Sequence, residues 1–151
     1  MAKPKLILIG CGTVGLGLLE IIQKKKPDID IVAISDFKKG SLHCSDGLHI
    51  EKVIEILNAG GSLEEYECSS DCCNGELHKG WDAIETIQKS DADIMAEMTY
   101  TDLKTGQPAT KHIEEALKKG MHVTTSNKGP AALYYEKLSK LAEEKLSLIH
   151  I

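Results

Sequence analysis

Three glycines near the start of the chain have the spacing of a phosphate-binding turn. The apolar segment Leu6–Ile9 runs into Gly10, Gly12 and Gly15, which form a Gly-x-Gly-x-x-Gly pattern. Between a strand and a helix, such glycines permit a tight turn, a close approach of the backbone to a pyrophosphate and close helix–strand packing. Amide groups at the start of the helix then face the phosphates, and the helix dipole favours their charge. The residues predicted to form this turn are Gly10, Cys11, Gly12, Thr13, Val14 and Gly15.

An acidic residue follows at the distance expected for a ribose contact. Asp36 ends a second apolar run about 20 residues beyond the glycines, where a carboxylate accepts hydrogen bonds from the adenosine ribose hydroxyls. Lys38 and Lys39 come soon after it, and basic residues there can meet a 2′-phosphate, although Asp36 would repel that group. A solvated turn explains the two lysines equally well. The predicted cofactor is therefore NAD or NADP, with Lys38 as a candidate contact.

The elements that must position these residues alternate along the chain. Apolar runs predict strands, and helical periodicity predicts helices. The expected strands are 6–9, 29–34, 93–99 and 122–125, and the expected helices are 14–24, 48–58, 81–89, 106–119 and 130–145. Residues 37–47 are predicted to be a loop, and residues 62–79 to be irregular. This alternation predicts an α/β fold with a Rossmann-type doubly wound parallel sheet.

Two polar segments lie where ligands bind in such sheets, directly after predicted strands. One contains Met98 and Thr99, and the other contains Ser126, Asn127 and Lys128. A lysine between a strand and a helix can hold an anionic or carbonyl group beside a cofactor. The alternative for Lys128 is a solvated loop lysine.

Composition limits the class of protein. The chain has 151 residues, of which 42% are hydrophobic and 27% charged, enough for one domain with its own core. A net charge of −5 without an evident basic face argues against a nucleic-acid partner. No apolar run reaches the length of a membrane span and no signal peptide is evident, so the expected location is cytoplasmic, with no membrane partner.

Cysteine and histidine residues offer a weaker candidate site. Cys68, Cys72, Cys73 and His78 lie close together, but they lack the paired Cys-x-x-Cys spacing of zinc sites. The favoured interpretation is a loop with reduced thiols and no metal. His112 is expected on the surface of a helix.

Several segments together point to one family. They are 10–15, 34–36, 92–94, 105–109 and, most specifically, Gly120-Met121-His122-Val123-Thr124-Thr125-Ser126-Asn127-Lys128-Gly129-Pro130. Through these segments, the chain resembles the N-terminal NAD(P)-binding domain of homoserine dehydrogenases over most of residues 5–145. The resemblance implies reversible hydride transfer between L-homoserine and L-aspartate 4-semialdehyde, on the route to threonine, methionine and isoleucine.

The resemblance also implies roles for individual residues. Lys128 would be a catalytic residue at the junction of cofactor and substrate, acting by proton transfer or by polarising the carbonyl. The residues that would border the nicotinamide ribose and ring are Met98, Thr99, Ser126 and Asn127. Two alternatives stay open: another dehydrogenase with the same cofactor domain, and a non-catalytic nucleotide-binding module.

Parts of the expected enzyme have no counterpart in this chain. Residues 1–145 are predicted to be the cofactor domain, with the sheet incomplete at the C-terminus and the substrate-binding, dimer-forming domain absent. Residues 146–151 are predicted to be a non-native tail, because they resemble a translated sequencing adapter; the alternative is a genuine last strand. We therefore expect weak cofactor binding and no turnover. A homodimer and a small-molecule substrate are expected for the intact enzyme only.

Overall fold

A mixed sheet forms the centre of the molecule, within the residues that the computed structural model describes, 2–68 and 76–151. In this part of the chain the sheet has seven strands in the order β4-β3-β2-β1-β5-β6-β7. The strands are β1 (Lys5–Ile9), β2 (Asp30–Asp36), β3 (Gly40–Cys44), β4 (Leu77–Lys79), β5 (Ile94–Glu97), β6 (His122–Thr125) and β7 (Ile149–His150).

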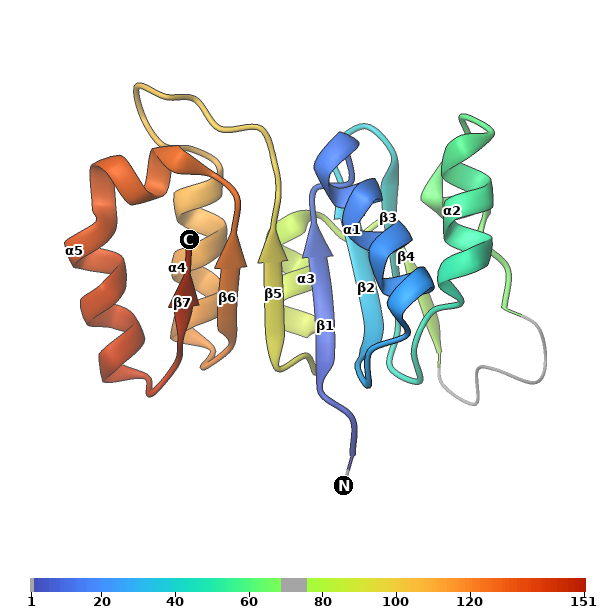
Figure 1. Ribbon diagram of the computed structural model, residues 1–151, viewed down its shortest axis with the longest axis horizontal. Coiled ribbons are helices and arrows are strands. Elements are labelled where there is room, and N and C mark those ends of the chain that lie inside the picture. The colour runs from blue at the N-terminus through green and yellow to red at the C-terminus, as the bar shows by residue number, and fades with distance from the viewer. Residues whose placement is uncertain (1, 69–75) are drawn as a thin grey trace.

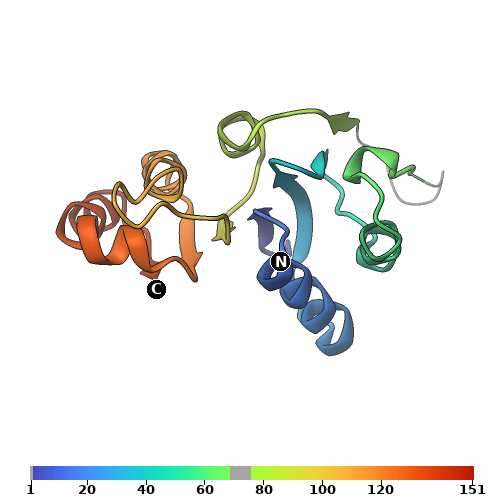
Figure 2. The same cartoon turned by 90° about the horizontal axis from the view of Figure 1, so that it is seen from above.

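Helices connect the strands and cover the two faces of the sheet. They are α1 (Thr13–Lys25), α2 (Ile50–Asn58), α3 (Ala83–Lys89), α4 (Ala109–Lys118) and α5 (Lys128–Glu144), with a 3-10 turn at Leu63–Glu65. Figures 1 and 2 show α1 and α2 on one side of the sheet and α3 and α4 on the other. The prediction of a doubly wound α/β fold is confirmed.

Alternating side chains of the central strand build two separate cores. Leu6 and Leu8 of β1 pack in the cluster that includes α1 and α2, whereas Ile7 and Ile9 pack in the cluster that includes α3, α4 and α5. Successive residues of a strand point to opposite faces, so a strand covered on both faces has to be apolar throughout. This accounts for the unbroken apolar segment before the glycines.

The sheet departs from the predicted parallel arrangement at one edge. Strand β1 pairs in parallel with β2 and β5, and β6 pairs in parallel with β5 and β7. However, β3 is antiparallel to β2, and β4 is antiparallel to β3. Only a short turn separates Asp36 from Gly40, and a short turn joins neighbouring strands only in an antiparallel hairpin. The predicted loop 37–47 is therefore wrong for residues 40–44, and the irregular segment contains β4.

A strand also lies within the predicted tail. Ile149 pairs with Val123 of β6, and the backbone amide of Leu148 donates a hydrogen bond of 3.0 Å to Nδ1 of His122. Residues 149–150 therefore extend the sheet by one short parallel strand, as the alternative interpretation of this segment expected. The non-native origin of residues 146–151 stays a prediction. No helix in the described residues is long and apolar enough to cross a membrane.

Candidate functional site

The glycine-rich turn leaves the N-terminus of α1 open. Gly12 is the N-cap residue, and within the described residues no side chain caps this end of the helix. The first hydrogen bond at this end runs from the Leu16 amide to the Gly12 carbonyl, at 2.9 Å. The amides of the first helical turn have no partner within a helix and carry the positive end of its dipole. An anion such as a phosphate can satisfy them.

The other two glycines of the pattern are enforced by close packing. Gly10 has φ of +90°, and a Cβ there would lie 2.7 Å from the carbonyl carbon of Met98. A Cβ on Gly15 would lie 2.4 Å from the carbonyl oxygen of Gly10, so α1 could not approach the turn as it does. At Gly12, by contrast, a Cβ would meet no described atom within 4 Å. The space beside Gly12 is therefore open to a ligand.

Asp36 lies directly beside this turn. Its Oδ2 accepts a hydrogen bond of 2.8 Å from the Cys11 amide, and its Oδ1 accepts from the amides of Lys38 and Lys39 at 2.9 and 3.0 Å. The carboxylate thereby joins the end of β2 to the start of α1. A carboxylate has about four acceptor positions, so one remains for a ribose hydroxyl.

The cysteine in the turn is not a nucleophile. Cys11 is fully buried, and its carbonyl accepts a hydrogen bond from Nζ of Lys39. Burial raises the pKa of the thiol to about 11, since it outweighs the opposing effect of the Lys39 ammonium. The thiol is therefore protonated at neutral pH, and the reactive form of a cysteine is the thiolate.

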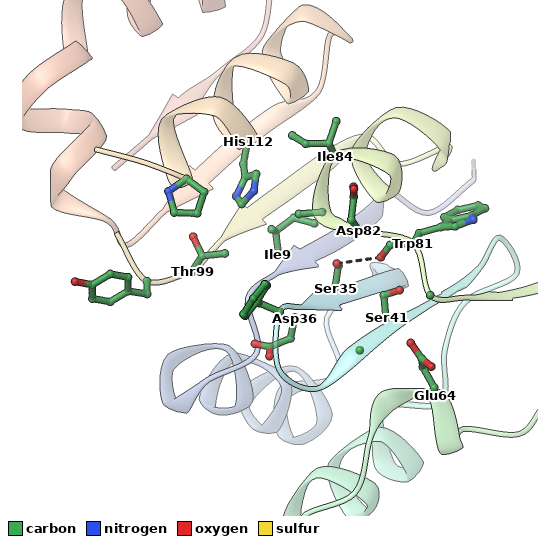
Figure 3. Close-up of a pocket in the computed structure, with 16 residues that line it drawn as sticks. Ile9, Ser35, Asp36, Ser41, Glu64, Trp81, Asp82, Ile84, Thr99 and His112 are labelled. Atoms are coloured by element: carbon green, nitrogen blue, oxygen red, sulfur yellow. Dashed lines mark hydrogen bonds between the residues drawn. The ribbon is translucent and has the colours of Figure 1, made fainter. Parts of the chain in front are cut away.

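A pocket of about 550 Å³ opens beside Asp36 on the face of the sheet covered by α3 and α4 (Figure 3). Next to Asp36, the hydroxyl of Ser35 donates a hydrogen bond of 3.4 Å to the Trp81 carbonyl, which joins β2 to the segment before α3. The pocket is lined by Ile9, Ser35, Asp36, Phe37, Gly40, Ser41, Glu64, Gly80, Trp81, Asp82, Ala83, Ile84, Thr99, Tyr100, Pro108 and His112.

The structure brings some of the predicted site residues together and leaves others apart. Asp36 and Thr99 line the pocket, whereas Lys38 is exposed outside it. Ser126, Asn127 and Lys128 lie after β6, one strand further along the same edge of the sheet. Lys128 is exposed as the first residue of α5. The roles assigned to these residues stay predictions.

Sequence reasoning did not single out a buried carboxylate at this edge. Glu97, the last residue of β5, is 0% exposed. Its Oε1 accepts hydrogen bonds from the amide (3.0 Å) and the hydroxyl of Thr99, and its Oε2 accepts from the hydroxyl of Thr125 (3.0 Å) and the side-chain amide of Asn127. Burial alone would raise the pKa of Glu97, but His112 and the donors on Thr99 and Asn127 outweigh it and lower the pKa. Glu97 is therefore ionised at neutral pH.

The expected surface position of His112 is wrong. This residue is 7% exposed on α4, lines the pocket, and places Nδ1 3.6 Å from Oε1 of Glu97. Helix α4 follows β5 in the chain and packs against it, which buries His112 between the two elements. The residues near it in the sequence, Lys111 and Glu114, are charged and give no local signal of this burial.

The cysteine cluster gives no metal site within the described residues, where no group of three or more potential ligands is found. Cys72 and Cys73 lie outside the described residues. Cys68 is disulfide-bonded, so the prediction of a reduced thiol is wrong for this residue. His78 stacks on Trp81 instead, with ring centroids 4.5 Å apart.

Open α/β sheets bind their ligands at the carboxyl edge, where the strand order reverses, and here β1 and β5 meet at that point. The turn, Asp36 and the pocket all lie at this edge, which defines the protein as a dinucleotide-binding domain of the Rossmann class. Residues 10–151 match the family model described as the NAD-binding domain of homoserine dehydrogenase. The chain belongs to this family.

Relatives of known function agree with the family. The homoserine dehydrogenase of Methanocaldococcus jannaschii is 34% identical over 146 residues, which cover 92% of this chain and 41% of that protein. The NAD(+)-dependent homoserine dehydrogenase of Pseudomonas canavaninivorans is 31% identical over 94% of this chain and 40% of its own length. A hyperthermophilic archaeal homoserine dehydrogenase mutant solved in complex with NADPH superposes with a TM-score of 0.80 at 25% identity, covering 99% of this chain and 43% of that chain. The chain thus spans about two fifths of the length of these relatives.

Proposed function

We propose that this chain is the cofactor-binding part of a homoserine dehydrogenase. It would bind NAD or NADP for the interconversion of L-homoserine and L-aspartate 4-semialdehyde, in which the nicotinamide carries the hydride. The observation that carries the proposal is the uncapped N-terminus of α1, with open space beside Gly12 and the Asp36 carboxylate next to it. Family membership supports the reaction.

The residues at the first turn would hold the two phosphates and the adenosine. The first amides of α1 donate to the pyrophosphate, and the first turn of this helix contains no acidic residue that would oppose it. Asp36 accepts a hydrogen bond from a ribose hydroxyl through its remaining acceptor position. The end of the pocket beside Asp36 takes the adenine, which packs against the apolar ring of Phe37.

The second polar segment would serve the substrate end. Lys128 is exposed at the edge of the sheet, where its ammonium can donate a hydrogen bond to the substrate oxygen. Such a hydrogen bond polarises an aldehyde during reduction and can transfer a proton to the oxygen as the alcohol forms. Met98, Thr99, Ser126 and Asn127 would border the nicotinamide. Family membership supports these assignments.

The choice of cofactor depends on the same carboxylate. A 2′-phosphate beside Asp36 would be repelled, which favours NAD, whereas the exposed ammonium of Lys38 offers that phosphate a partner. Relatives of both kinds exist, since one is named NAD(+)-dependent and another is solved with NADPH. We propose that NAD is preferred. Hydrogen bonds fix the Asp36 carboxylate beside the glycine-rich turn, whereas the Lys38 side chain is exposed.

Replacement of Asp36 tests the proposal. Asp36→Asn keeps the size of the side chain but removes its charge, so the affinity for NADH should fall by about tenfold, as for loss of a charged hydrogen bond. The affinity for NADPH should fall less, because repulsion of the 2′-phosphate is relieved. Isothermal titration calorimetry measures both. Asp28→Asn is the control. Asp28 lies just before the start of β2, at the end of the strand opposite Asp36, and its replacement should leave both affinities unchanged. A wild-type chain that binds neither nucleotide would contradict the proposal.

A further inference from the structure

Among the residues that the structure describes, Glu97 is the only buried carboxylate. A carboxylate without solvent contact costs several kcal/mol in transfer from water unless donors replace the lost hydration. The donors come from two segments that are far apart in the chain: Thr99 follows β5, whereas Thr125 ends β6 and Asn127 precedes α5. Glu97 therefore joins the two polar segments that follow β5 and β6.

The side chain of Asn127 donates to Glu97 and does not cap the helix that it precedes. Asparagine is a favoured N-cap residue, and Asn127 occupies the N-cap position of α5. Its side chain makes no capping hydrogen bond there and donates to Oε2 of Glu97 instead, while its backbone amide donates to Oγ1 of Thr125 at 3.0 Å. The first turn of α5, including Lys128, is thereby held relative to Glu97.

His112 extends the cluster to the pocket. Its Nδ1 faces Oε1 of Glu97 at 3.6 Å, and the ring is otherwise buried on α4. Within the described residues this nitrogen has no hydrogen-bond partner, so Oε1 of Glu97 is the carboxylate oxygen that it faces. The His112 side chain also lines the pocket, so the ring can contact a ligand there (Figure 3).

The cluster lies on one side of the edge at which a dinucleotide would bind. The turn and Asp36 belong to β1 and β2, whereas the donors to Glu97 follow β5 and β6, and the strand order is β2-β1-β5-β6. A dinucleotide spans such an edge, so its adenosine half lies by β2 and its nicotinamide half by β5 and β6. Glu97 is thus placed to affect one half of the cofactor without contact with the other.

We propose that Glu97 is a positioning residue, which acts through Thr99, Asn127 and His112 to fix the nicotinamide ring of the cofactor relative to Lys128. The proposal rests on the proposed function, since it needs a dinucleotide at this edge. Glu97 itself touches no ligand, because it is completely buried. A merely structural carboxylate would affect binding of both halves of the cofactor alike, whereas a positioning carboxylate affects only one.

Titration with whole and partial cofactors separates these roles. ADP-ribose contains the adenosine, the pyrophosphate and a ribose but lacks the nicotinamide. Glu97→Gln should weaken NADH binding to the 151-residue chain by about tenfold and leave ADP-ribose binding within about twofold, measured by calorimetry. The control is Glu115→Gln, a carboxylate of α4 that contacts Lys118 and Gln88 away from the pocket; it should change neither affinity. An equal loss for both ligands, or no loss for either, would overturn the proposal.

A second variant covers the case in which Glu97→Gln does not fold. Thr125→Val keeps the shape of the side chain and removes one donor to Glu97, so it should produce a smaller loss that is again confined to NADH. A loss shared by ADP-ribose would overturn the proposal. Measurements on the wild-type chain test the two proposals separately. Failure to bind ADP-ribose contradicts the proposed function, whereas equal affinities for ADP-ribose and NADH overturn only the positioning role of Glu97.

Discussion

At the scale of single residues, Asp36 combines a structural and a binding role. Three backbone amides donate to its two oxygens, so the carboxylate holds the glycine-rich turn in place before any ligand arrives. Preorganised acceptors and donors avoid the cost of ordering them on binding. The same residue that contacts the ribose would therefore also keep the first amides of α1 aligned with the phosphates.

His43 is a buried histidine whose surroundings disfavour its protonated form. Within the described residues neither ring nitrogen has a hydrogen-bond partner, and the ring stacks on Trp81 with centroids 4.9 Å apart. Burial lowers the pKa of His43, and His78 and Lys5 act in the same direction, whereas Asp91, 3.9 Å away, opposes them. The folded protein therefore holds His43 neutral where the unfolded chain would protonate it.

This lowered pKa predicts a pH dependence of stability. As the pH falls below about 6.5, the unfolded state binds a proton that folded His43 does not, so the free energy of unfolding decreases. His43→Phe keeps an aromatic ring against Trp81 and removes the titration, so the loss of stability between pH 7 and pH 5 should become smaller. Urea denaturation followed by circular dichroism measures it. His150→Phe, at an exposed site, should retain the wild-type loss; an unchanged loss in His43→Phe would refute the prediction.

At the scale of elements, α1 depends on how closely it approaches β1. The space between the helix and the turn is filled at Gly15, where an added methyl group would overlap the Gly10 carbonyl. Gly17 lies two residues further along the same helix, and a Cβ there would meet no described atom within 4 Å. The two positions therefore separate packing from helix propensity within a single element.

Alanine substitutions at these two glycines should have opposite effects. Gly15→Ala should lower the free energy of unfolding by about 1–3 kcal/mol, as overpacking does, and weaken NADH binding because the turn shifts. Gly17→Ala should raise the free energy of unfolding by about 0.5–1 kcal/mol, because alanine favours the helix. Chemical denaturation of the pair checks both signs. Similar effects of the two substitutions would show that α1 does not pack on the turn as described.

At the scale of the whole molecule, the sheet provides one continuous edge, along which the proposed dinucleotide would place its adenosine by β2 and its nicotinamide by β5 and β6. The pocket and the buried Glu97 cluster share that edge. The chain spans about two fifths of the length of its homoserine dehydrogenase relatives. Cofactor binding and substrate turnover are therefore separate properties that need separate measurements.

The 151-residue chain is expected to bind cofactor without oxidising homoserine. The chain spans about two fifths of the length of these relatives, and Lys128 is the only residue of it that the resemblance places at the substrate. A steady-state assay of homoserine-dependent reduction of NAD and NADP should give a rate indistinguishable from the blank without protein, while calorimetry detects NADH binding by the same preparation. Measurable turnover by the purified chain would refute this expectation.

Local sequence was sufficient for the turn and the main order of elements. Gly10, Gly12, Gly15 and Asp36 are recognisable because each role depends on backbone geometry within one strand–helix–strand unit. The hairpin strand at 40–44 was missed, because Gly-Ser-Leu-His-Cys has no β-branched or aromatic residue and its alternation of polar and apolar residues is very short. Its pairing with β2 comes from the short turn and the sheet beside it.

By itself, the sequence determined that this chain forms a nucleotide-binding α/β domain with its phosphate turn at the first glycines. Only the tertiary structure decided that Glu97 is buried among donors from the ends of β5 and β6 and that His112 of α4 faces it. A glycine's use follows from its own backbone and nearest neighbours. The role of a buried charge depends on which distant side chains the completed sheet brings within hydrogen-bond distance, and that is a property of the whole fold.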